Sequence, residues 1–242
     1  MLLTYLLWPF MPLLPAPALR FPNFADMRKK LLLYIAFFLV LVIGFYVALT
    51  QVIPGYGKVK LPVLNYVHPF EFVNQDGKTI SGRDLEGKVY VAEFFFTTCK
   101  SICPILNTNL RPVHDAYIND PRFVIVSHTC DPQTDSSARL KVYADSLKVD
   151  TRQWWFLTGR KDSLYNAARN SYLLDDPKNN LQNIDDQFMH TQFFALVDKS
   201  GQVRKIYDGL KKEELNDLKK DIQGLLDEPV DQKRFSNNLF GN

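Results

Sequence analysis

The sequence predicts an α/β sandwich with a mixed central sheet, preceded by one N-terminal transmembrane helix. Three observations support this fold class. Leu31–Leu49 has no charged residue over 19 positions. Apolar, strand-like runs alternate with helical segments from about residue 88 onward, which is typical of parallel βαβ units. A β-hairpin followed by an amphipathic helix then closes the folded part of the chain.

The apolar run near the N-terminus is the predicted membrane anchor. At about 1.5 Å per helical residue it nearly spans a hydrocarbon core of about 30 Å. Arg28, Lys29 and Lys30 precede it, and the positive-inside rule places that end in the cytoplasm. A cleaved signal peptide is the alternative, but no small-x-small cleavage site closes the run. We expect a single-pass protein of the cell inner membrane, with its soluble domain in the periplasm.

Composition shifts divide the chain into five parts. Residues 1–26 are proline-rich and apolar, and we expect them to be a non-native or disordered extension. The anchor follows at 27–50, and we expect translation to begin at its first residue, Met27. Residues 51–65 mix Pro, Gly and Lys and are predicted to be a linker. The folded domain is expected over 66–228, and a flexible tail over 229–242.

The charge balance excludes one class of function. The first 50 residues hold four of the 29 basic residues and one of the 26 acidic ones, so the remainder is electrically neutral. A neutral body with no basic face does not predict nucleic-acid binding.

Each element of the folded domain has a local signal. An Asp-Gly pair in NQDGKT predicts a hairpin turn, and Pro104 suits the first turn of a helix. The aromatic run at 154–156 is interpreted as core packing. We expect strands at 70–73, 88–96, 123–128, 154–157, 193–197 and 203–207, and helices at about 104–117, 136–147, 161–171 and 211–226. With the closing hairpin and helix, this order predicts a thioredoxin-like sandwich whose site lies at the carboxyl ends of the parallel strands.

The most informative motif is FFFTTCKSICP, which places Cys99 and Cys103 four residues apart at a helix start. Both sulfurs can face the same way there, and the helix N-terminus stabilises thiolates. The pair alone fits either a redox dithiol or a metal site. Thiolates favour monovalent copper, and His190 supplies an imidazole, so two sulfurs and one nitrogen make a three-coordinate copper site. Structural zinc would require a fourth ligand.

The spacing argues against neighbouring activities. A thioredoxin dithiol has two residues between its cysteines, whereas three intervene here. Thioredoxins also place a cis-proline opposite the dithiol, but no proline appears in DQFMHTQFF, where His190 occupies the corresponding segment. A peroxiredoxin nucleophile has Thr or Ser three positions ahead of it, where Phe96 stands before Cys99.

These motifs resemble the Sco/SenC family of membrane-anchored copper-binding proteins of cytochrome c oxidase assembly. The matching features are FFFTTCKSICP, VSHTCDPQTD and MHTQFFALVDKSGQV, within about residues 66–228. The resemblance implies a thioredoxin-like copper-binding domain with Cys99, Cys103 and His190 as the copper ligands. It also implies copper delivery to, or thiol reduction at, the dinuclear copper centre of oxidase subunit II.

The expected function is therefore that of a copper metallochaperone, not an enzyme in the ordinary sense. Its partners would be oxidase subunit II and a periplasmic copper chaperone. The alternative is a thiol–disulfide oxidoreductase that keeps the subunit II cysteines reduced, with Cys99 as the attacking thiolate. A membrane-tethered redox or copper sensor is a third reading.

Several residues near these motifs are open to two interpretations. Cys130 is either a small buried residue at a strand end or an auxiliary ligand or resolving thiol. Asp131 and Asp135 are expected to cap the turn and the following helix. His128 is a candidate for a supporting role at the site. His68 and His114 are expected to lie on the surface.

Overall fold

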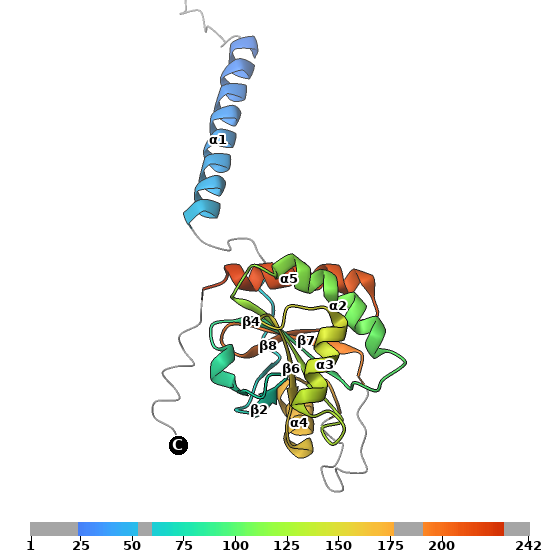
Figure 1. Ribbon diagram of the computed structural model, residues 1–242. Coiled ribbons are helices and arrows are strands. Elements are labelled where there is room, and N and C mark those ends of the chain that lie inside the picture. The colour runs from blue at the N-terminus through green and yellow to red at the C-terminus, as the bar shows by residue number, and fades with distance from the viewer. Residues whose placement is uncertain (1–23, 53–59, 177–190, 230–242) are drawn as a thin grey trace, which may run out of the picture. The chain divides into compact units, whose positions relative to one another are not determined.

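The computed structural model describes residues 24–52, 60–176 and 191–229 (Figure 1). The chain divides into two compact units, Met1–Tyr56 and Gly57–Asn242, which we describe separately.

Within its described residues, the first unit consists of one long helix, α1 (Phe24–Val52). Its stretch Met27–Gln51 is long and apolar enough to cross a membrane. Large apolar side chains such as Phe38 and Val40 are exposed along it. Exposed apolar side chains all round a helix are stable in lipid but costly in water. The helix therefore fits a membrane anchor, as the sequence predicts.

The second unit is built on an eight-stranded mixed sheet in the order β1-β8-β7-β4-β5-β6-β2-β3. The three central strands β4, β5 and β6 are parallel, and every other neighbouring pair is antiparallel. The strands are β1 (Asn65–Tyr66), β2 (Glu71–Asn74), β3 (Thr79–Ser81), β4 (Val89–Phe95), β5 (Phe123–Thr129), β6 (Trp154–Thr158), β7 (Phe193–Val197) and β8 (Gln202–Asp208). Strand β4 pairs with β5 over its whole length. Both strands are buried on both faces, as is usual for parallel strands covered by helices.

Helices cover both faces of the sheet, with α2 and α5 on one side and α4 on the other (Figure 1). The core on the first side includes residues of α2, α3 and α5, and the core on the second includes residues of η1, α4 and η2. The bounds are α2 (Cys103–Tyr117), α3 (Ser137–Leu147), α4 (Lys161–Asn166), α5 (Lys212–Asp227), η1 (Gly82–Leu85) and η2 (Ala167–Ser171). The predicted thioredoxin-like sandwich with a mixed sheet is therefore confirmed.

One histidine prediction is wrong. His68 is exposed as expected, but His114 is buried. It follows Leu110 by four residues on α2 and so shares the helix face that packs on the sheet. Its ring lies 5.6 Å from that of Trp154, and Nδ1 is 3.0 Å from the carboxylate of Asp115.

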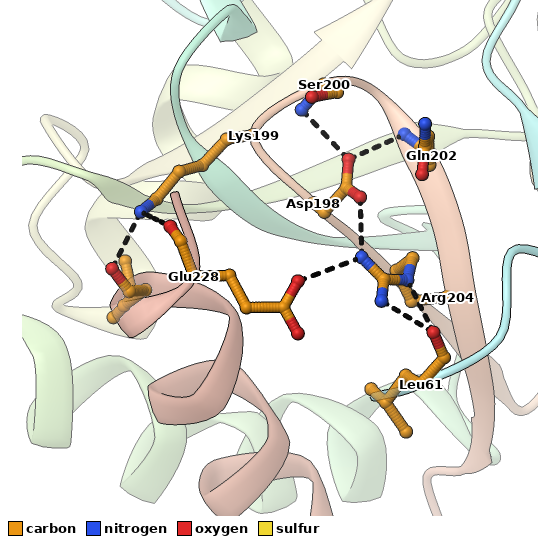
Figure 2. A network of polar contacts seen from close by, with 8 residues as sticks. Leu61, Asp198, Lys199, Ser200, Gln202, Arg204 and Glu228 are labelled. Carbon is orange, nitrogen blue, oxygen red and sulfur yellow. Dashed lines mark hydrogen bonds and ion pairs between the residues drawn. The ribbon is translucent and has the colours of Figure 1, made fainter. Parts of the chain in front are cut away.

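A buried arginine fixes the entry of the chain into the domain (Figure 2). Arg204 on β8 donates to Asp198 at 2.8 Å and to Glu228 at 3.3 Å, and its Nε and Nη2 donate to the carbonyl of Leu61. Lys199 donates to the carbonyl of Glu228 at 2.8 Å. The predicted linker at 51–65 thus joins the folded domain at Leu61, before its predicted end.

His128 of β5 is enclosed on the second side of the sheet. Its ring stacks on Phe94 at 4.9 Å, and its Nε2 has no hydrogen-bond partner in the described part of the chain. The other rings around it belong to Phe70, Phe72 and Tyr172. Burial among these rings lowers the pKa of His128 from 6.5 to about 4.

This burial predicts a loss of stability in acid. Between about pH 6.5 and 4 the unfolded chain binds a proton at this position that the folded chain excludes, so stability falls as the pH falls. The stabilisation is complete above pH 6.5, and its loss reaches about 3 kcal/mol near pH 4. We expect the free energy of unfolding in urea to fall between pH 6.5 and 4 by about 3 kcal/mol less in His128→Phe than in the unmodified protein. His68→Phe, at an exposed position, serves as the control, and parallel curves for all three proteins would contradict the prediction.

Candidate metal centre

The two motif cysteines lie where the chain leaves β4 and enters α2. Strand β4 ends at Phe95, and the amide of Cys99 donates to the carbonyl of Phe96 at 3.2 Å, which closes a tight turn. Cys103 is the first residue of α2, followed by Pro104, which lacks the amide hydrogen that a first turn leaves unbonded. The pair therefore stands at the carboxyl end of a central parallel strand and at a helix N-terminus, as the sequence predicts.

The two thiols are adjacent and largely buried. The backbone amide of Cys103 lies 3.4 Å from Sγ of Cys99, and the Cys103 thiol donates a hydrogen bond to the same sulfur. The hydroxyl of Ser101 is 3.6 Å from the same sulfur. Cys99 is 8% exposed and Cys103 4%, so both are more enclosed than a site on an open sheet edge.

The surroundings make the two cysteines chemically unequal. Burial acts to raise the pKa of Cys99, but hydrogen bonds from Cys103 and Ser101 outweigh it and lower that pKa. The pKa of Cys103 is well above its usual range, mainly through burial and also because its thiol donates to Cys99. Cys99 is therefore the more readily ionised thiol of the pair.

Asp135 holds the cysteine loop in place. Its fully buried carboxylate accepts hydrogen bonds from the amide of Thr97 at 3.0 Å, from the Thr97 hydroxyl, and from the hydroxyl of Thr129 at 2.6 Å. The predicted capping role of Asp135 is wrong, because Ser136 is the N-cap of α3 and accepts from the amide of Arg139. The parallel pairing of β4 with β5 places the cysteine loop beside the loop that contains Asp135. The Asp135 carboxylate therefore accepts hydrogen bonds from Thr97 in the other loop.

Asp131 behaves as predicted, since its carboxylate accepts from the amide of Thr134 at 3.4 Å within the turn.

Cys130 belongs to the opposite side of the sheet. It packs in the core cluster that contains His128's neighbours Phe72 and Phe94, whereas Cys99 and Cys103 pack in the cluster on the other face. Its thiol donates to the carbonyl of Phe95 at 3.1 Å, and burial raises its pKa to about 12. These contacts agree with a small buried residue at a strand end.

The third predicted ligand, His190, lies outside the described residues. Within the ranges that the structure describes, no three His, Cys, Asp or Glu side chains are grouped to hold a metal ion. The donors that are described fit a soft metal, because two neighbouring sulfurs at a helix start supply thiolates.

Two contributors to this region were missed in the sequence. Thr97 is ordinary in sequence and gains its role only from the contact with Asp135. Glu93 is an acid inside the apolar run KVYVAEFFF, which forms a strand buried on both faces. A charged residue within such a run is a sign, readable from the sequence, of a buried acid.

The Asp135 contacts predict a strong effect of a small change. Asp135→Asn replaces one of the two acceptor oxygens with an NH₂ donor and removes the negative charge, and we expect a loss of about 2–4 kcal/mol in unfolding free energy. The freed loop should also raise the rate of Cys99 alkylation by iodoacetamide. Asp131→Asn, which alters one long hydrogen bond, should stay within about 0.5 kcal/mol of the unmodified protein. Equal losses for both variants would argue against this role of Asp135.

Comparisons with known proteins agree with this geometry. A family model described as SCO1/SenC matches residues 60–227. The chain is 34% identical over 175 residues to the SCO1 protein homolog of Bacillus subtilis (strain 168), covering 70% of this chain and 87% of that protein.

Solved structures with the same fold include BsSco, a member of the Sco family of cytochrome c oxidase assembly proteins. It is 31% identical, with a TM-score of 0.59 over 70% of this chain and 98% of that one. The fold is shared as well by Arabidopsis thaliana ScoI, whose structure has copper bound, at 23% identity and a TM-score of 0.52 over 66% of this chain and 99% of that one. The family match covers well over half of the sequence, and the chain belongs to the SCO1/SenC family.

Proposed function

We propose that this protein is a membrane-anchored copper metallochaperone that assists assembly of the dinuclear copper centre of cytochrome c oxidase. The observation that supports it most directly is the pair of adjacent free thiols at the start of α2, in which Sγ of Cys99 accepts hydrogen bonds from the thiol and the backbone amide of Cys103. The SCO1/SenC family match, the description of BsSco and the copper in Arabidopsis thaliana ScoI point the same way.

The proposed ligands are the thiolates of Cys99 and Cys103 and the imidazole of His190. Two thiolates and one imidazole suit monovalent copper, which accepts three-coordinate sites. The copper ion is cargo, so the site must also release it. Cys99 is the more exposed and the more readily ionised thiol, and it is the ligand that an incoming sulfur or nitrogen of the partner meets first.

The proposed partner is oxidase subunit II, and a periplasmic copper chaperone is the proposed donor. The helix α1 would hold the domain at the inner membrane, with the basic residues Arg28, Lys29 and Lys30 on the cytoplasmic side. The copper-binding domain would then face the periplasm, where a membrane-bound oxidase subunit exposes its own metal site.

The ligand assignment predicts copper stoichiometry. We expect the full-length chain in detergent to bind about one copper(I) ion under anaerobic titration. Cys99→Ser, Cys103→Ser and His190→Ala should each weaken binding by at least about tenfold, because each removes one of three ligands. His68→Ala, at an exposed histidine, is the matched control.

Cys130→Ser should leave both stoichiometry and spectrum unchanged, because its thiol lies in the opposite core cluster. Unaltered affinity in His190→Ala would refute the histidine ligand, and unaltered affinity in both cysteine variants would refute the site.

A second function, thiol–disulfide exchange, is favoured by the inequality of the two cysteines. Cys99 has the lowered pKa that an attacking thiolate needs, and Cys103 lies beside it as the resolving thiol. In this step Cys99 attacks a disulfide of the partner and forms a mixed disulfide. Cys103 then displaces the remaining partner sulfur, so that two electrons pass to the partner and a Cys99–Cys103 disulfide remains.

Thiol exchange predicts a separable phenotype. His190→Ala should retain reduction of a model disulfide peptide while its copper affinity falls, because exchange needs no imidazole. Cys99→Ser should abolish reduction, and Cys103→Ser should accumulate the mixed disulfide. If His190→Ala lost both properties together, the two functions would not be separable in this way.

A further inference from the structure

A layer of buried polar side chains separates the helix α2 from the sheet face beneath it. Its members are Cys103, Asn107 and His114 on α2, and Glu93, Ser127 and Trp154 on strands β4, β5 and β6. The layer begins at the cysteine pair and runs inward along α2. Polar groups at such depth need hydrogen-bond partners or a chemical role.

Glu93 is the member whose placement is least explained by packing. Along β4 it alternates with Val91 and Phe95, so its side chain points to the same face as Cys99 and Cys103. Its Oε1 accepts from the Ser127 hydroxyl at 2.5 Å. Its Oε2 has no hydrogen-bond partner in the described part of the chain, and the residue is 1% exposed.

The environment of Glu93 makes its charge changeable. A buried carboxylate with one hydrogen bond is costly, so burial raises its pKa to about 7, and the bond from Ser127 offsets this only in part. The Ser127 hydroxyl is itself fixed, because it accepts from the indole of Trp154 at 2.8 Å. The carboxyl is thus held in one place and changes its charge close to neutral pH.

Glu93 is coupled to the cysteine pair through space. No hydrogen bond joins it to either thiol within the described residues, yet its negative charge contributes to the raised pKa of Cys103, after burial and the neighbouring Cys99. The other titratable groups of the layer are Cys103 and His114 from α2, and Tyr143 from α3 lies beside it, where its hydroxyl accepts from Asn107. Burial, and the charge of Glu93 after it, keep the pKa of Tyr143 well above its usual range, so that phenol stays neutral. A negative charge created at the cysteines therefore favours a proton on Glu93.

We propose that Glu93 takes up a proton when the cysteine pair binds monovalent copper, so that the charge of the loaded site is balanced inside the fold. This inference rests on the proposed copper-binding function. Two thiols lose two protons when they become ligands, one copper ion brings one positive charge, and the site changes from neutral to a net charge of −1 with a neutral imidazole. The Glu93 carboxylate accepts one of those protons and becomes a neutral acid. No electron is transferred, and the protein releases one proton fewer to solvent.

Proton release during copper(I) titration tests the proposal. The full-length chain in detergent is titrated anaerobically with copper(I) in two buffers of different ionisation enthalpy, and the calorimetric difference counts the protons released. At about pH 8 Glu93 is ionised before loading, so Glu93→Gln should release about one proton more than the unmodified protein. At about pH 5.5 Glu93 is already protonated, and the difference should vanish. Glu86→Gln, at an exposed acid before the start of β4, should match the unmodified protein at both pH values.

The outcomes separate this proposal from the one it rests on. One copper ion per chain in both proteins with equal proton counts at pH 8 would overturn the role of Glu93 and leave copper binding intact. Failure of the unmodified protein to bind copper would overturn the proposed function itself.

A second measurement follows the protonation of the carboxyl group directly. The infrared difference spectrum between loaded and copper-free protein at about pH 8 should gain the carbonyl stretch of a protonated carboxyl group, and its absence would contradict the proposal. His114→Asn should keep this band, since the proton is assigned to Glu93.

Discussion

The parallel pairing of β4 with β5 is the constraint on which the site depends. Seven consecutive residue pairs, from Val89 with Phe123 to Phe95 with Thr129, align the two strand ends. Because both strands stop at the same edge, the cysteine loop after β4 meets the loop that contains Asp135. The buried carboxylate then bonds Thr97 and Thr129 and holds the two loops in one arrangement. Loss of that alignment would separate the cysteine loop from Asp135 and so release its hold on the loop.

The sheet also divides the three cysteines of the chain between its two faces. Cys99 and Cys103 pack on the face covered by α2 and α5, whereas Cys130 packs on the other face and donates to a strand carbonyl. Two cysteines are therefore available to act together, and the third is held in the core. Glu93 is buried on the face of the cysteine pair, and His128 is buried on the face of Cys130. Desolvation moves their pKa values in opposite directions, since it disfavours the charged form of each.

The proposed copper-binding and thiol-exchange functions would draw on the same feature, the inequality of Cys99 and Cys103. A ligand that is readily ionised and slightly exposed suits both the exchange of a metal ion and attack on a disulfide. The second cysteine, enclosed at the first turn of α2, would complete either reaction. What would distinguish the two proposed functions is the imidazole of His190, which only the proposed metal site requires.

The sequence by itself determined the membrane anchor, the alternation of strands and helices, and the cysteine motif at a strand-to-helix junction. These features are local, because runs of apolar residues, turn signals and the spacing of two thiols are read within a short window. The tertiary structure alone decided what Asp135, His114, Cys130 and Glu93 do. Asp135 was expected to cap a helix and instead bonds the cysteine loop, and His114 was expected at the surface and is buried. The role of each depends on which face of the sheet it meets and which distant segment lies against it, and strand register and helix packing set those contacts across dozens of residues.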